Sequence, residues 1–303
     1  MRYAYYPGCS LHSTGVEYDK SLRAVAPHFG LEIDEPEGWV CCGTSSAHAT
    51  SRSLAAALPL HNLNLVAQSG HAEVLVPCAA CFARFKHALH EVREHPAAAA
   101  EVERVMGGKP ATSVKPVHPL EVLDSLAQRE EFRKSVVRDL SGLKVACYYG
   151  CLLTRPADVM RFDNCEYPMS MDRIVAACGA NPVDWSFKTE CCGASFSLTK
   201  TELVHDLTAK VLSDAKARGA NCIAVACSLC HANLDARQPE IEKKTGKKFG
   251  LPVLYFTQIL GLALGLPFKD IALHKHIVPP LGLVAGLRET ASAPRLLPAP
   301  PGA

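Results

Sequence analysis

The sequence Tyr-Ala-Tyr-Tyr-Pro-Gly-Cys at residues 3–9 returns as Val-Ala-Cys-Tyr-Tyr-Gly-Cys at residues 145–151. Each copy is typical of a short buried strand that ends in Gly-Cys at its C-terminal tip. A second apolar run in each half, residues 73–77 and 222–226, leads directly into a Cys-x-x-Cys motif. The chain is therefore predicted to be an internal duplication that carries thiols at the ends of strands.

Ten of the fourteen cysteines follow one pattern that occurs twice: a lone cysteine, a Cys-Cys-Gly, and a Cys-x-x-Cys. Between the lone cysteine and the pair lie 31 residues in the first copy and 39 in the second, and between the pair and the Cys-x-x-Cys lie 35 and 34. Burial of small apolar side chains does not explain such a repeat, so we predict two metal sites. The two sets are Cys9, Cys41, Cys42, Cys78 and Cys81, and Cys151, Cys191, Cys192, Cys227 and Cys230.

Helical segments separate the predicted strands. Residues 18–29 and 51–69 in the first half, and 170–178 and 201–218 in the second, carry apolar residues or end signals typical of helices. Strands that alternate with helices predict an α/β fold, with two pseudo-symmetric repeated domains and mainly parallel sheets. The metal sites are then expected at strand ends and loops, where open α/β sheets bind their ligands.

The predicted domain boundary lies near Leu140, where Ser-Gly precedes the restarted strand. We assign residues 1–140 to an N-terminal domain and residues 141–278 to a C-terminal domain. Residues 279–303 are rich in Pro and Ala, and we expect this tail to be extended or disordered.

Composition narrows the choice of function. The chain has 32 basic and 30 acidic residues, which gives no reason to expect binding to nucleic acid or to an anionic membrane surface. Its start has no apolar signal-peptide core, and its longest apolar stretch, residues 251–267, falls short of a membrane span. We therefore expect a cytoplasmic protein that does not span a membrane. In a reducing compartment, fourteen cysteines favour metal ligation or redox catalysis over structural disulfides.

Adjacent cysteines favour a centre with several metal atoms, because neighbouring side chains leave the backbone in diverging directions. A single tetrahedral zinc takes four ligands, commonly from two Cys-x-x-Cys-like pairs, whereas each set here has five thiols and one such motif. Iron–sulfur clusters are held by thiolates and contain several irons. Gly43 and Gly193 follow the pairs and permit the positive φ that brings the backbone close to a cluster. Zinc in one or both sites stays open as an alternative.

The pattern resembles the cysteine-rich CCG domain, and two copies in tandem resemble the B-type subunit of heterodisulfide reductase. The resemblance covers roughly residues 1 to 278 and includes Tyr-Tyr-Pro-Gly-Cys at 5–9 and the segment from Asp184 to Gly193. It implies one noncubane 4Fe–4S cluster on each set of five cysteines, and all ten positions are filled in this chain.

The resemblance also implies an activity and partners. Proteins of this family reduce a small disulfide, the mixed disulfide of coenzyme M and coenzyme B, to two thiols. Electrons come from a ferredoxin-like small subunit (C type) and a flavin-containing subunit (A type). His231, next to Cys230, is a candidate proton donor to the leaving thiolates, although it could simply begin a helix. Four basic residues near the motifs could bind an anionic substrate, and surface solvation explains them equally well: Arg84, Arg155, Lys188 and Lys200.

Two other functions are compatible with the sequence. The chain could be the iron–sulfur electron-transfer subunit of a lactate, glycolate or glycerol-3-phosphate oxidoreductase, because such subunits also carry paired CCG domains. It could also be a non-catalytic, zinc-binding structural subunit. The cysteines outside the pattern, Cys147, Cys165, Cys178 and Cys222, are expected to pack in cores or loops.

Overall fold

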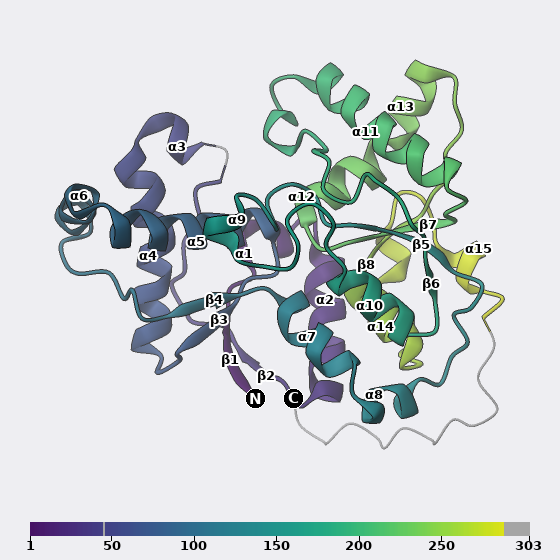
Figure 1. The fold of residues 1–303 in the computed structure, drawn as a ribbon, viewed down its shortest axis with the longest axis horizontal. Helices are drawn as coiled ribbons and strands as arrows, with labels where there is room; N and C mark the ends of the chain where they lie inside the picture. Colours follow the sequence, from purple (N-terminus) through teal and green to yellow (C-terminus); the bar gives the residue numbers. More distant parts are fainter. Residues whose placement is uncertain (45, 288–303) are drawn as a thin grey trace.

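The computed structural model describes residues 1–44 and 46–287 and contains two four-stranded sheets (Figure 1). The strand orders are β2-β1-β3-β4 and β6-β5-β7-β8, and every neighbouring pair is parallel. The predicted α/β class, the duplication and the parallel pairing are confirmed.

The elements of the first half are β1 (Arg2–Tyr5), α1 (Gly8–Leu11), α2 (Val16–Val25), η1 (Ala26–Phe29), β2 (Glu32–Asp34), α3 (Ala47–Thr50), α4 (Arg52–Gln68), β3 (Glu73–Leu75), α5 (Ala79–Glu94), α6 (Pro96–Met106), β4 (Lys115–Val117), α7 (Pro119–Ala127) and α8 (Glu130–Ser135). Those of the second half are β5 (Lys144–Tyr148), α9 (Ala157–Met160), α10 (Ser170–Ala177), β6 (Asn181–Pro182), η2 (Ala194–Phe196), α11 (Thr201–Ala217), β7 (Cys222–Val225), α12 (Ser228–His231), the π-helical turn η3 (Ala232–Ala236), α13 (Gln238–Thr245), β8 (Val253–Tyr255), α14 (Phe256–Ala263), η4 (Leu273–Lys275) and α15 (Leu281–Val284).

The strand order places a topological switch point in each sheet. From β1 the chain first goes to β2 on one side and then crosses to β3 on the other, and β5 relates to β6 and β7 in the same way. In open parallel sheets, ligands bind at the carboxyl ends of the strands that flank such a point. Cys9 follows β1 and Cys78 follows β3, while Cys151 and Cys227 follow β5 and β7. The fold therefore brings the lone cysteine and the Cys-x-x-Cys motif of each half toward one edge of its sheet.

Helices from both halves pack between the sheets. Helix α2 contacts α14, and α7 contacts α10, so helices of one half cover those of the other (Figure 1). Tyr18 stacks on Tyr255 with ring centroids 4.3 Å apart, and the hydroxyls of Ser21 and Thr257 lie 2.6 Å apart in a buried contact. The buried apolar residues of both halves form one continuous core.

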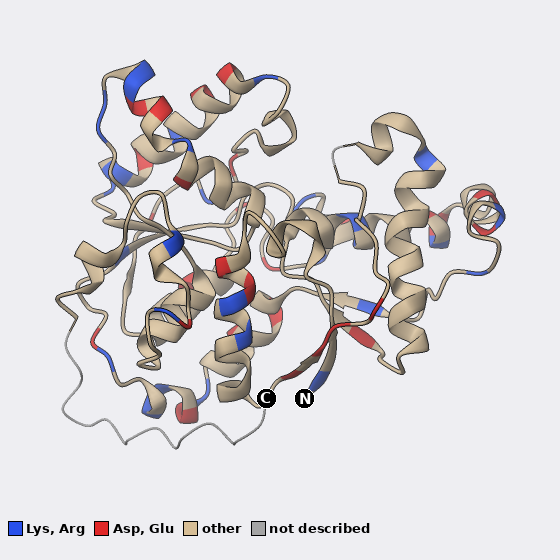
Figure 2. Ribbon diagram, turned by 180° about the vertical axis from the view of Figure 1, so that it is seen from behind, with Lys and Arg blue, Asp and Glu red and all other residues tan. Residues whose placement is uncertain are grey.

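Charge is interspersed over both halves, with basic and acidic residues side by side on the ribbon (Figure 2). Among residues 1–44 and 46–287, no helix is both long enough and apolar enough to cross a membrane.

The second Cys-x-x-Cys lies at the start of the four-residue α12, which is followed by the π-helical turn η3, so His231 ends α12 and does not begin a helix. The segment expected to be extended after residue 278 contains the short helix α15, and positions 288–303 lie outside the described residues. The domain boundary at residue 140 stays a prediction; β5 begins at Lys144.

Candidate metal centres

Glycines at the tips of β1 and β5 let the backbone approach a thiol. Gly8 has φ +68° and Gly150 has φ +70°, the left-handed region that side chains rarely adopt. A Cβ on Gly8 would lie 3.1 Å from Cys81 Sγ, and one on Gly150 would lie 2.9 Å from Cys230 Sγ. Any larger residue would displace the second thiol of the Cys-x-x-Cys motif, so both positions are specific for glycine.

Tyrosines three residues before each lone cysteine hold the Cys-Cys-Gly loops. The hydroxyl of Tyr6 donates to the carbonyl oxygen of Val40 at 2.8 Å, and that of Tyr148 donates to the carbonyl oxygen of Glu190 at 2.6 Å. Each acceptor is the residue immediately before its cysteine pair. The loops then turn at Gly43 and Gly193, whose φ angles of +76° and +77° confirm the predicted left-handed conformation.

Both Cys-x-x-Cys motifs lie at the start of a helix. Cys78 is the N-cap of α5 and Cys227 is the N-cap of α12. The unpaired N–H groups of a helix N-terminus favour negative charge, and the pKa of Cys78 is indeed lowered, which favours the thiolate that binds metals. At Cys227 the hydrogen bond from Cys230 is outweighed by the one to Cys78 and by burial, so the pKa of that thiol is raised.

Thiols of the first set lie in contact. Cys42 Sγ is 3.1 Å from Cys81 Sγ and 3.1 Å from the hydroxyl of Thr44. Hydrogen bonds from Cys41 and Cys81 lower the pKa of Cys42 to about 3. A disulfide has sulfurs about 2.05 Å apart, whereas two thiolates on one tetrahedral metal lie roughly 3.8 Å apart. The separation between Cys42 and Cys81 is therefore closer to that of ligands than to that of a disulfide.

The second set repeats this arrangement. Cys192 Sγ is 3.6 Å from Cys230 Sγ, and the backbone N–H of Gly193 donates to Cys191 Sγ at 3.3 Å. A hydrogen bond from Cys151 lowers the pKa of Cys191 to about 6, and one from Cys230 lowers the pKa of Cys192. Each half therefore contains thiols that ionise easily.

The two sets meet at the interface between the halves. A hydrogen bond from Cys227 lowers the pKa of Cys78 well below its ordinary value, so the first thiols of the two Cys-x-x-Cys motifs are in contact. The hydroxyl of Ser228 donates to Cys78 Sγ at 3.5 Å and lies 2.7 Å from the hydroxyl of Ser10. Side chains that follow a cysteine of each half thus join the two sites.

His118 connects the segments that lead into the two Cys-x-x-Cys motifs. Its ring is fully buried, and its Nδ1 accepts from the N–H of Leu120 at 3.2 Å, which places the ring proton on Nε2. Nε2 lies 2.8 Å from the carbonyl oxygen of Pro77 and 3.2 Å from that of Ala226. One N–H is therefore shared between the residues that precede Cys78 and Cys227.

Exposure differs among the ten thiols. Cys9, Cys41 and Cys191 are exposed and Cys151 is half-buried, whereas the thiols of both Cys-x-x-Cys motifs are buried. One side of each site therefore faces solvent, and the other faces the second site across the interface between the halves.

Residues outside the pattern are mostly structural. Cys147, Cys178 and Cys222 are buried, as expected for core residues, and Cys165 is half-buried in a loop. Lys188 is 1% exposed and its Nζ lies 2.7 Å from Asp172 Oδ1, so this lysine is committed to a buried ion pair.

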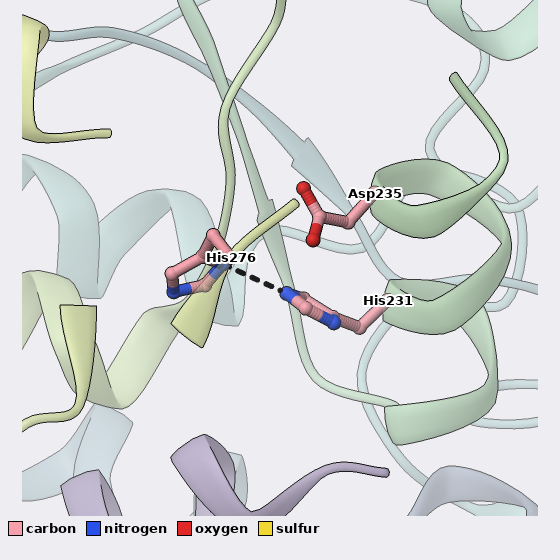
Figure 3. Close-up of side chains that lie close together, drawn as sticks. All are labelled: His231, Asp235 and His276. Carbon is pink, nitrogen blue, oxygen red and sulfur yellow. Dashed lines mark hydrogen bonds between the residues drawn. The ribbon is translucent and has the colours of Figure 1, made fainter. Parts of the chain in front are cut away.

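His231 belongs to a buried cluster with Asp235 and His276, whose candidate ligand atoms all lie within 4.8 Å (Figure 3). His231 Nε2 lies 3.1 Å from His276 Nδ1. Gln258 Nε2 donates to Ile271 O and lies 2.9 Å from His276 Nε2, so that ring atom accepts and Nδ1 carries the proton.

The two oxygens of Asp235 accept from the N–H groups of Ile277 and Val278. A protonated Nδ1 has no lone pair for a metal, so we assign the cluster to a hydrogen-bond network. Burial lowers the pKa of His231 to about 3, which keeps its ring neutral near pH 7. Its role as a proton donor stays a prediction.

Each of the two duplicated halves matches a known domain family. The cysteine-rich domain family CCG matches residues 3–86 and 145–235, one copy in each half. A membrane anchor subunit of 8-methylmenaquinol:fumarate reductase from Wolinella succinogenes is 32% identical over 277 residues, which cover 91% of this chain and 96% of that protein. The B-type subunit of ferredoxin:CoB-CoM heterodisulfide reductase from Methanosarcina mazei is 27% identical over 292 residues, which cover 94% and 96%.

A second methanogen relative and one solved structure extend the comparison. The B-type subunit of a ferredoxin/F420H2-dependent CoB-CoM heterodisulfide reductase from Methanosarcina acetivorans is 25% identical over 296 residues, covering 96% of this chain and 98% of that protein. A hypothetical protein from Helicobacter pylori shares the fold with a TM-score of 0.72 at 11% identity, and the match covers 91% of this chain and 51% of that one. The two domain matches and the curated relatives place this chain in the CCG cysteine-rich domain family, with the B-type subunits of heterodisulfide reductase among its relatives.

Proposed function

We propose that this chain is the catalytic iron–sulfur subunit of a heterodisulfide reductase-like complex, which reduces a small disulfide to two thiols. The observation that carries the proposal is the contact between the two thiol sets at Cys78 and Cys227, where the hydroxyl of Ser228 donates to Cys78 Sγ at 3.5 Å. Cleaving a disulfide takes two electrons, and two adjacent centres that each supply one are suited to that demand.

The donor set fits iron–sulfur clusters. Each half offers five thiols, with lowered pKa values at Cys42 and Cys78 in one half and at Cys191 and Cys192 in the other. Within the described residues, no three thiols have their sulfur atoms all within 4.8 Å of one another, as one tetrahedral zinc would require. Cys42 contacts both Cys41 and Cys81, and Cys78 contacts both Cys81 and Cys227, so the thiols form a chain of contacts, which suits a centre with several irons better. We propose one noncubane 4Fe–4S cluster on each set of five.

This chain's own residues would position such clusters and screen them from water. The hydroxyls of Thr44 and Ser228 and the amide of Asn233 lie near thiol sulfurs, at 3.1 Å from Cys42, 3.5 Å from Cys78 and 3.7 Å from Cys192. Hydrogen bonds to cluster sulfurs raise the reduction potential by stabilising the reduced, more negative state. When bound, the clusters supply one-electron steps and a soft metal that accepts a thiolate.

The exposed sides of the sites, at Cys9, Cys41 and Cys191, are where a disulfide and partner subunits would approach. We propose that electrons enter from a ferredoxin-like small subunit and, upstream of it, from a flavin-containing subunit. A cytoplasmic location is part of the same proposal.

A second function is favoured by the relative from Wolinella succinogenes, which is named as a subunit of a fumarate reductase. The chain would then carry electrons between a membrane quinol and a partner enzyme, without a disulfide substrate. The direct contact between the two thiol sets also suits a pair of electron-transfer centres.

Disulfide turnover separates the two functions. Protein purified without oxygen is supplied with reduced viologen dye and a panel of small disulfides, and thiol release is measured. Catalytic release with retention of both clusters supports the reductase. Rapid oxidation by a quinone analogue, with no thiol release from any disulfide of the panel, supports the electron-transfer subunit and contradicts the reductase.

A further inference from the structure

Arg84 lies one helical turn after Cys81 and has an unusual environment for an arginine. Its side chain is half-buried, and its Nε–H is buried without a hydrogen-bond partner. Buried donors are nearly always paired, because losing water without gaining a partner costs free energy. No carboxylate of the described residues forms an ion pair with it. This donor therefore has an unmet requirement for an acceptor.

A cavity of about 170 Å³ lies beside this guanidinium. Helix α5 forms one wall, and the other comes from α3 and the start of α4, including His48 and Arg52. The one acidic side chain in the lining, Glu91, is paired with Arg52 at 3.2 Å, so its charge is already balanced. The positive charge of Arg84 is therefore not balanced by a carboxylate of the cavity lining. His87 also lines the cavity, and burial followed by the charge of Arg84 lowers its pKa.

In the second half, the residue that corresponds to Arg84 has a hydrogen-bond acceptor. Asn233 stands three residues after Cys230, as Arg84 stands three after Cys81. Asn233 Nδ2 donates to the carbonyl oxygen of Cys192 at 3.1 Å and so ties the Cys-x-x-Cys helix to the Cys-Cys-Gly loop. In the first half, the corresponding Nε–H makes no such bond. An additional acceptor would satisfy this donor.

We propose that this cavity binds a small oxyanion, such as phosphate or the carboxylate of a small molecule, on the guanidinium of Arg84. An arginine offers Nε–H and Nη–H as a fork that matches two oxygens of such an anion. His48 and His87 supply further donors from the two walls. The bound anion links α5, which follows Cys78 and Cys81, to the α3–α4 segment, which follows Cys41 and Cys42. This site is independent of the reaction catalysed at the clusters.

The test is calorimetric titration of inorganic phosphate, and separately of acetate, into protein purified without oxygen, at constant ionic strength set with chloride. The wild type is expected to bind at least one of the two anions saturably. Arg84→Gln is expected to weaken that binding by about tenfold or more, because a neutral amide replaces the charged guanidinium and its hydrogen bonds to the anion are weaker. Arg84→Lys keeps the charge but loses the fork, and is expected to fall between the two.

Arg104→Gln is the matched control, because this arginine is exposed on α6 and, within the part of the chain that the structure describes, its ion pair is with Glu101. Its affinity should equal that of the wild type. Iron and sulfide content are measured on every variant, so loss of the clusters is distinguished from loss of the anion. If Arg84→Gln does not fold, Arg52→Gln replaces it: Arg52 is 84% exposed, and its removal frees the charge of Glu91 in the cavity.

Weaker anion binding in Arg52→Gln then supports the site. Unchanged affinity in Arg84→Gln overturns the proposal, as does unchanged affinity in Arg52→Gln where that variant replaces it. No saturable binding of either anion by the wild type also overturns it.

Discussion

Replacing His118 by phenylalanine removes the N–H that the two halves share. The new ring keeps the contacts with Phe82 and Phe162, whose centroids lie 5.6 and 6.2 Å from that of His118. It leaves the carbonyl oxygens of Pro77 and Ala226 without this donor, at a cost of about 1–3 kcal/mol. It also removes the N-cap of α7, which is worth about 0.5–2 kcal/mol. The expected loss in the free energy of unfolding is therefore about 1.5–5 kcal/mol.

Urea unfolding followed by far-UV circular dichroism measures this loss as a lower midpoint with an unchanged slope. The control is His61→Phe, at an exposed position on α4, which is expected to change stability by no more than about 0.5 kcal/mol. An equally small change in His118→Phe would refute the claim that this residue joins the two sites.

Three further outcomes follow from buried polar contacts. Lys188→Met leaves the carboxylate of Asp172 buried without its partner, and is expected to cost about 3–5 kcal/mol in urea unfolding; a loss below about 1 kcal/mol would show that the pair is dispensable. Burial lowers the pKa of His118 to about 4. Between about pH 6.5 and 4, this imidazole therefore binds a proton in the unfolded chain but not in the folded one. The contribution of this neutral ring to the free energy of unfolding is complete above pH 6.5 and is lost as the pH falls toward 4, by up to about 3 kcal/mol. In His118→Phe the free energy of unfolding should therefore decrease less over this pH range. An equal decrease in both proteins would show that His118 is not its cause. Tyr148→Phe frees the carbonyl oxygen of Glu190, and is expected to cost about 1 kcal/mol and to speed loss of iron to a chelator; wild-type kinetics would show that the loop is held by other contacts.

Much of the architecture could be predicted from local sequence. The repeated strand ending in Gly-Cys predicted both the duplication and the position of thiols at strand ends, because parallel strands that alternate with helices leave little choice of topology. The positive φ of Gly43 and Gly193 was also predictable, because a sharp turn directly after two adjacent cysteines favours the left-handed conformation that glycine adopts without strain. Residue-by-residue ligation stays a proposal, because spacing alone does not place a metal.

The features missed from sequence depend on contacts between distant segments. His118 lies in no recognisable sequence motif. Its contact with the second half depends on the start of α7 packing beside the carbonyl oxygen of Ala226, 108 residues later in the chain. Tyr6 and Tyr148 could have been noticed as a repeated tyrosine before the lone cysteine, but their acceptors, Val40 and Glu190, are backbone carbonyls. Lys188 was a candidate for anion binding, and the structure commits it to an ion pair instead.

We propose that each set of five cysteines holds an iron–sulfur cluster. Iron and acid-labile sulfide are therefore measured on protein purified without oxygen, beside Cys78→Ser and, as a control, Cys178→Ser at a buried cysteine outside the pattern. With one cluster on each set, about eight irons and as much sulfide per chain are expected in the wild type and in Cys178→Ser, and about half of that in Cys78→Ser. Zinc without sulfide in the wild type, or full iron content in Cys78→Ser, would contradict it.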